Sequence, residues 1–162
     1  MTESEIVDLV TAMPGVVAVT ASEENGAPPV AWGDTFFFYD PDAAGGEARR
    51  MPFATIVRND YEGFDVRSEL SRPGVFRLNV GVGRERFEDL VGHAPAAHER
   101  HHDEVDYAAL DRLLPHPVYA AQGWVAIVCP GARTGALART LLAEAHARAR
   151  RSQERTGTAR ER

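Results

Sequence analysis

The spacing of apolar residues changes along the chain, and each spacing predicts a different kind of element. Near the N-terminus, Ile6, Leu9 and Met13 recur at the interval of an amphipathic helix, and residues 2–5 ahead of them match a capping box. Residues 75–80 instead alternate apolar and polar side chains, which is typical of a strand with one polar face. We therefore predict a fold that contains both helices and strands.

Turn signals divide the chain into short elements of both kinds. β-Branched and aromatic runs predict five strands, at residues 16–20, 30–39, 53–57, 75–80 and 123–128. Helical patterns occur at residues 3–12, 65–70, 84–91, 95–104, 107–114 and from 134 onward. Because short turns favour antiparallel pairing, we expect a two-layer α+β fold. In it a mainly antiparallel sheet of about five short strands packs against the N- and C-terminal helices, with small helices between the last strands.

Composition limits the chemistry and the surroundings that suit this chain. All 18 basic residues are arginine, which excludes a lysine nucleophile, and Cys129 is the only cysteine, so neither an internal disulfide nor a cysteine-rich zinc site can form. The N-terminus lacks the features of a signal peptide, and no apolar run is long enough to span a bilayer. We therefore expect a cytoplasmic protein without membrane contact.

Charge is distributed unevenly along the chain. Residues 1–147 carry 22 acidic residues and 12 arginines, whereas residues 148–162 carry six arginines and two acidic residues. We interpret the first range as a single α+β domain and the second as a basic, disordered tail. An acidic domain disfavours nucleic-acid binding, because contacts with phosphate need positive charge. Weak DNA binding through the tail and a sheet edge is kept as an alternative.

The segment His98-Glu99-Arg100-His101-His102 matches the H-E-x-x-H pattern of zinc hydrolases. On an α-helix His98 and His102 lie on one face and can bind a metal ion, while Glu99 activates a water molecule. Such helices bury apolar residues at the two x positions, however, and here these positions hold an arginine and a histidine. We therefore favour a solvent-exposed helix face, and keep a metal-dependent hydrolase with His98 and His102 as metal ligands as the alternative.

A second group of residues suggests a ligand site on the sheet. Asp34 is an acid within an apolar strand, and Arg77 and Asn79 project from one face of another strand. If these two strands pair, Asp34 and Arg77 can form a partly buried ion pair that lines a pocket. A salt bridge at the rim of the sheet, worth about 0–1 kcal/mol, is the alternative.

Three further residues complete the tentative ligand-binding set. Trp32 and His116 add aromatic side chains, and Arg84 follows the strand-to-helix turn at residues 81–83, where helix N–H groups can bind an anion. A tight turn explains the glycines at positions 81 and 83 equally well. The chain has no nucleophile elbow and no dinucleotide fingerprint, so we expect no cofactor and favour a non-enzymatic role.

Several short motifs carry a resemblance to known families. Residues 13–16 (Met-Pro-Gly-Val), 32–34 (Trp-Gly-Asp), 36–38 (three phenylalanines), 116–117 (His-Pro) and 123–125 (Gly-Trp-Val) resemble the MmcQ/YjbR-like group. The chain resembles an actinobacterial family of unknown function more closely, up to about residue 150. The wider resemblance implies a fold similar to that of the frataxin homologue CyaY, and DNA binding is ascribed to that group by likeness of fold. It supplies no residue of known function.

Together, these observations favour a domain that binds a small ligand or a protein partner. We expect the contacts to involve the sheet and residues 77–93. Neither the oligomeric state nor the chemical identity of the ligand follows from the sequence.

Overall fold

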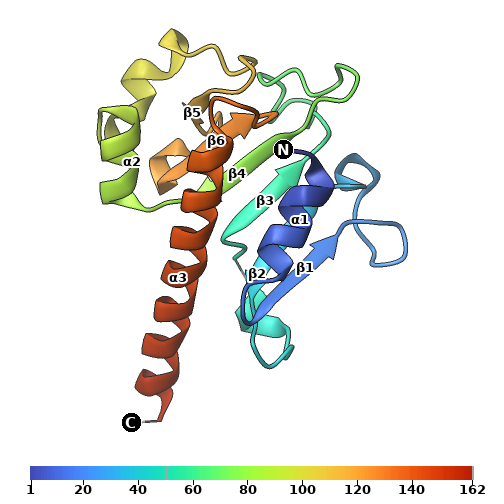
Figure 1. Cartoon of the computed structure of the whole chain (residues 1–162), viewed down its shortest axis with the longest axis vertical. Helices are drawn as coiled ribbons and strands as arrows, with labels where there is room; N and C mark the ends of the chain where they lie inside the picture. The colour runs from blue at the N-terminus through green and yellow to red at the C-terminus, as the bar shows by residue number, and fades with distance from the viewer. Residues whose placement is uncertain (50, 162) are drawn as a thin grey trace.

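The computed structural model describes residues 1–49 and 51–161. Within these residues, one antiparallel sheet has six strands in the order β1-β2-β3-β4-β6-β5 (Figure 1). The strands are β1 (Val16–Thr20), β2 (Thr35–Tyr39), β3 (Ala54–Val57), β4 (Arg77–Gly81), β5 (Leu113–Pro115) and β6 (Trp124–Val128). The predicted α+β fold with an antiparallel sheet is therefore confirmed, with six strands where about five were expected.

Helices cover one face of this sheet. The α-helices are α1 (Glu3–Thr11), α2 (Arg84–Val91) and α3 (Gly135–Arg160), and the 3-10 helices are η1 (Pro29–Ala31), η2 (Gly46–Arg49), η3 (Pro95–Glu104) and η4 (Ala120–Gln122). Helix α1 contacts β1, and α3 contacts β2 and β4. Figure 1 shows both helices in front of the sheet, with α2 at the side where β5 and β6 lie. Among the described residues, no helix combines the length and apolarity that a membrane crossing requires.

The sheet register gathers apolar side chains on the face under the helices. Ile56, Leu78 and Ile127 are register partners across β3, β4 and β6. All three belong to the main core, together with Ile6 of α1 and Leu141 of α3. Because successive side chains in a strand point to opposite faces, the residues between them must project from the other side.

That second face is polar at its centre. Thr55 and Asn79 are register partners, as are Val57 and Arg77. Residues 58–76, here called the covering loop, lie over this face, where Leu70 of the loop packs with Val57 and Val128. The sheet thus has an apolar face under helices and a buried polar face under a loop.

Three local predictions were wrong. Residues 107–114, predicted as a helix, instead lead into β5, because Leu113 pairs with Ile127 at the edge of the sheet. The strand predicted at 30–39 begins only at Thr35, since two consecutive prolines start a 3-10 turn before it. Residues 65–70 form turns and no helix, because the side chain of Asp65 pairs with the sheet.

The tail expected to be disordered is helical. Helix α3 continues through Arg160 and extends away from the sheet (Figure 1). Alanine, arginine and glutamate favour helices, and Arg150 donates to Glu154 one turn later at 2.9 Å. Helical propensity and this contact outweigh the repulsion between the arginines. The last turns of α3 therefore stand beside the domain and form one wall of a groove.

Candidate functional site

The buried polar face centres on the guanidinium of Arg77, which is 1% exposed. Its two terminal nitrogens donate to the carboxylate of Asp65 at 2.6 and 3.0 Å, and Nη1 also donates to Ser68 at 2.8 Å. Its Nε donates to Oδ1 of Asn79 at 2.8 Å, and Asn79 donates onward to Thr55 at 3.0 Å. Every member of this network is buried. Because Asp65 and Ser68 belong to the covering loop and Arg77 belongs to β4, the network joins the loop to the sheet.

Asp34 belongs to the same face but is not the ion-pair partner of Arg77. Strand β3 lies between β2 and β4, so the pairing assumed for Asp34 and Arg77 does not form, and Arg77 pairs with Asp65 instead. The Asp34 carboxylate accepts hydrogen bonds from the backbone N–H of Arg58 at 2.7 Å and from the hydroxyl of Tyr61. Burial raises the pKa of Asp34, and these hydrogen bonds partly oppose the rise.

Burial and the adjacent Asp34 carboxylate also change the acidity of Tyr61. Desolvation raises the pKa of the Tyr61 hydroxyl, and its hydrogen bond to Asp34 raises that pKa further. The phenol therefore stays protonated and remains the donor of this hydrogen bond.

His116 lies close to this network. Its Nδ1 accepts backbone hydrogen bonds from Val118 at 3.0 Å and Tyr119 at 2.9 Å, so the ring proton must be on Nε2. Burial, together with the charge of Arg77, holds the pKa of His116 well below its usual value. His116 is therefore a neutral imidazole that orders the turn before β6.

The two remaining residues of the predicted set lie at its margins. Trp32 is exposed, and its carbonyl accepts a hydrogen bond from Asn59, whose amide also reaches Asp34 at 3.4 Å. Arg84 is exposed in the first turn of α2. The structure thus gathers Asp34, Arg77, Asn79 and His116 on one buried face, and leaves Trp32 and Arg84 at the surface.

The turn at residues 81–83 uses its glycines for close packing. The N–H groups of Val82 and Gly83 both donate to the carbonyl of Gly123, at 3.0 and 3.1 Å. A Cβ atom on Gly123 would lie 3.0 Å from the backbone of Gly83, and Gly123 has a φ of +79°. These two N–H groups are therefore engaged within the protein, and the anion site predicted at the first N–H groups of the following helix stays a prediction.

The histidines before Asp103 form a hydrogen-bonded chain, which we call the histidine relay: His93, His98, Tyr107 and His102. Nε2 of His93 lies 3.0 Å from Nδ1 of His98, and Nε2 of His98 lies 2.8 Å from the hydroxyl of Tyr107. The same hydroxyl lies 2.8 Å from Nδ1 of His102. The expected solvent-exposed helix face is therefore wrong for His98, which is only 5% exposed.

The α-helix assumed for a metal site does not form, because residues 95–104 are a 3-10 helix. The rings of His98 and His102, whose centroids lie 5.8 Å apart, both contact the hydroxyl of Tyr107. Both ring nitrogens of His98 are engaged within the relay. In the described part of the chain, no group of three His, Cys, Asp or Glu side chains is arranged to hold a metal ion.

An open groove of about 800 Å³ lies between the last turns of α3 and the sheet. Gly81 and Trp124 line it where β4 and β6 meet, and Met51 also lines it. Of the described residues that line this groove, three are arginines and none is acidic: Arg148, Arg155 and Arg160. We call this space the α3 groove.

Two polar side chains that line the α3 groove, Arg148 and Gln153, differ in their hydrogen bonding. Arg148 donates from Nη1 to the carbonyl of Gly81 at 3.3 Å, which holds the guanidinium beside the floor of the groove. The side-chain oxygen Oε1 of Gln153 is buried and accepts no hydrogen bond from the described residues. An unsatisfied buried acceptor costs about 1–3 kcal/mol, so a donor supplied by a ligand would be favourable there.

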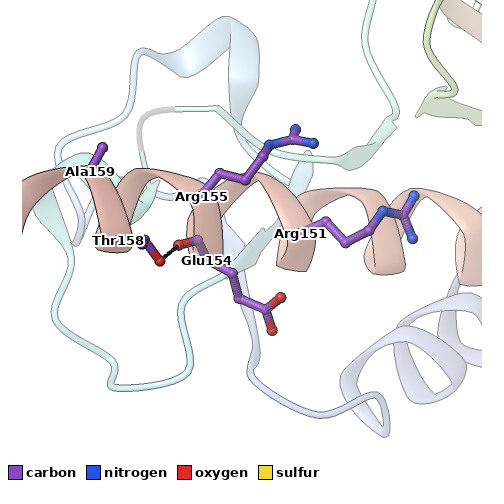
Figure 2. A pocket seen from close by; sticks show the side chains of 5 residues that line it. All are labelled: Arg151, Glu154, Arg155, Thr158 and Ala159. Atoms are coloured by element: carbon purple, nitrogen blue, oxygen red, sulfur yellow. Dashed lines mark hydrogen bonds between the residues drawn. The ribbon is translucent and has the colours of Figure 1, made fainter.

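A second hollow runs along the surface of α3 and shares Arg155 with the α3 groove. Its lining residues are Arg151, Glu154, Arg155, Thr158 and Ala159. Figure 2 shows that all five come from this one helix, and that Glu154 and Arg155 leave it in opposite directions. Because a single helix supplies every lining residue, the hollow lacks the second wall that encloses a ligand.

Comparison with known proteins places the chain in a family. A family model described as "Family of unknown function (DUF6194)" matches residues 1–158. The chain belongs to this family. The match extends along α3 to residue 158, so it includes Arg148 and Arg155 of the α3 groove but not Arg160. No curated protein and no solved structure matches the chain.

The family match agrees with the expectation of a family of unknown function. The relationship to the MmcQ/YjbR-like group and the bacterial source stay predictions. The sequence signal for the groove was the run of arginines after residue 147, together with Trp124 as an aromatic residue suited to a pocket. Interpreting that run as a disordered tail separated it from the sheet residues that it faces.

Proposed function

We propose that this protein is a binding domain whose α3 groove takes a small organic anion with a flat ring. The observation that carries the proposal is the composition of the lining: three arginines and no acid among the described residues, in a chain of net charge −6. An acidic body repels anions in general, so a local cluster of guanidinium groups is the place where one is attracted.

The groove offers complementary contacts for both parts of such a ligand. Guanidinium groups bind carboxylate and phosphate groups through paired N–H donors, and Arg148 already lies at the floor. Trp124 and the exposed Met51 supply apolar surface for a ring. Oε1 of Gln153, which has no donor among the described residues, suits a ligand amine or hydroxyl group.

The proposal refines the ligand-binding role expected from the sequence. It moves the contacts from the centre of the sheet to the C-terminal end of β4 and the N-terminal end of β6, because the predicted residues at the centre are buried beneath the covering loop. Gly81 lies within residues 77–93, which were expected to contact the ligand, and it also lines the α3 groove.

Fluorescence can test binding, because Trp32 and Trp124 are the only tryptophans in the chain. In a Trp32→Phe background Trp124 is the sole tryptophan, and it reports on the groove. We expect adenosine monophosphate to change its emission in a saturable manner, and inorganic phosphate or adenosine alone to do so more weakly. Replacing both Arg148 and Arg155 with glutamine should weaken binding at least about tenfold.

Replacing both Arg139 and Arg151 with glutamine provides the matched control, since it removes the same two charges from the same helix outside the α3 groove. This variant should bind adenosine monophosphate like its parent. Equal weakening in the control and in the variant that lacks Arg148 and Arg155 would show that only the overall charge matters. That result, or the absence of a saturable change with any of the three probes up to about 1 mM, would refute the proposal.

A further inference from the structure

The histidine relay joins two parts of the molecule that are distant in sequence. Tyr107, at its centre, lies beneath the guanidinium of Arg67, which is 4.8 Å from the ring centroid. Arg72 donates from Nη2 to the carbonyl of Ser68 at 2.9 Å and to that of Ala108 at 3.0 Å. Both arginines belong to the covering loop, so the segment that the relay orders also holds this loop against the sheet.

We propose that the histidine relay is a pH-operated latch, which keeps residues 92–107 against the covering loop when its imidazoles are neutral and releases them on acidification. This inference concerns a different part of the molecule from the α3 groove and does not depend on ligand binding there.

Counting protons shows why the relay accepts one additional proton but not two. Three hydrogen bonds join its four members, and each bond holds one proton. A single protonated histidine at one end of the relay fits, because every bond then points away from it. If His93 and His98 are both protonated, Nε2 of His93 and Nδ1 of His98 both carry protons, which meet head-on across the hydrogen bond that joins them. That hydrogen bond must then break, and a buried donor loses its partner.

Neighbouring groups oppose positive charge inside the relay. The ring of His101 stacks on that of His93 with centroids 4.2 Å apart, and Phe87 lies against both His93 and His98. Arg67 adds a positive charge from the covering loop, while Asp103 pairs with Arg67 at 3.7 Å and Glu104 pairs with His101 at 3.1 Å. The two carboxylates are exposed and already engaged, so they offset little of the cost.

The pKa values of His93 and His98 determine whether acidification stabilises or destabilises the closed form of the latch. Burial, reinforced by the adjacent His93, lowers the pKa of His98 to about 4, and burial also lowers the pKa of His93. An opened segment exposes imidazoles with an ordinary pKa of about 6.5. Between these two values the open form binds more protons, so the closed form is fully stable above about pH 6.5 and loses stability as the pH falls toward 4.

Hydrogen exchange measured by mass spectrometry, corrected for intrinsic rates, tests the latch on the full chain. From about pH 7.5 to about pH 5, protection of residues 92–107 should fall at least about tenfold more than that of β3 and β4. In His98→Gln the ring whose pKa is lowered is absent, so most of this pH-dependent loss should disappear. His146→Gln removes a titratable ring outside the relay and should retain the full response.

Three outcomes would overturn the latch. Protection of residues 92–107 that changes with pH no more than that of the sheet would show that the relay does not open. An undiminished response in His98→Gln, with its fold verified at neutral pH by circular dichroism, would place the titrating group elsewhere. Protection that rises with added Zn²⁺ and is lost with a chelator would identify the imidazoles as metal ligands.

Discussion

Single residues decide how the polar face of the sheet is held, and Arg77 has the largest effect. Its guanidinium makes paired contacts with Asp65 in an environment that excludes water, and Ser68 and Asn79 complete its hydrogen bonds. A buried ion pair contributes little net stability compared with apolar residues. Removal of one partner is costly, however, because the remaining charge has neither water nor a counterion. The buried charge of Arg77 is therefore balanced by the carboxylate of Asp65 in the covering loop.

Asp65→Asn should destabilise the protein by about 3–5 kcal/mol, because it leaves the Arg77 guanidinium buried without its counterion. Urea unfolding followed by circular dichroism measures this loss. The control Glu144→Gln removes an exposed partner of Arg86 and should cost about 0–1 kcal/mol. A loss for Asp65→Asn no larger than that of the control would mean that water reaches Arg77 in solution.

Among the elements, the position of α3 depends on a carboxylate outside the helix. Asp111 accepts hydrogen bonds from the backbone N–H groups of Gly131, Arg133 and Thr134 at 2.8 to 3.0 Å. This contact fixes the turn between β6 and α3, and with it the direction in which the long helix leaves the sheet. The hydrogen bond from the Thr134 hydroxyl and those from the backbone hold the pKa of Asp111 well below its usual value.

Asp111→Asn should loosen the first turn of α3 and change the acid response of the protein. Because the pKa of Asp111 is lowered in the folded state, its contribution is present above about pH 4 and is lost as the pH falls below that value. Hydrogen exchange of residues 131–138 at neutral pH should be faster in the variant than in the wild type. Thermal unfolding should show a smaller difference between wild type and variant at pH 3 than at pH 7. A constant difference would contradict the assignment.

At the scale of the whole molecule, the residues of α3 that stabilise the core are separate from those that carry positive charge. The buried residues of α3 end at Ala145, whereas the arginines that line the α3 groove begin at Arg148. The first part of the helix therefore completes the core, and the last turns supply positive charge beside an acidic body. The same long helix serves both purposes because it extends beyond the sheet.

A chain that ends at residue 147 should keep a cooperative thermal transition, since it retains every fully buried residue of α3. It should lose binding of adenosine monophosphate, because Arg148 and Arg155 are absent. Circular dichroism and the fluorescence titration measure the two properties separately. Full-length affinity in the shortened chain would place the ligand outside the α3 groove, whereas a non-cooperative transition would show that the last turns also stabilise the core.

Local patterns in the sequence were sufficient where an element depends on its own residues. The capping box at Thr2 and Glu5 forms as predicted, with hydrogen bonds of 2.8 and 3.1 Å. The predicted alternation in β4 holds too, with Leu78 in the main core and Arg77 on the opposite face. Helix caps and strand periodicity arise from neighbours within a few residues, so the sequence alone predicts them.

Other features were decided by partners far along the chain. Strand β5 exists because Leu113 meets Ile127, His98 is buried because Tyr107 and His93 enclose it, and Asp65 pairs with Arg77 because the covering loop folds over the sheet. The sequence by itself determined the fold class, the antiparallel pairing and the end of the chain where positive charge accumulates. Only the tertiary structure decided which residues form the relay and the α3 groove, because contacts between distant segments leave no periodic signal.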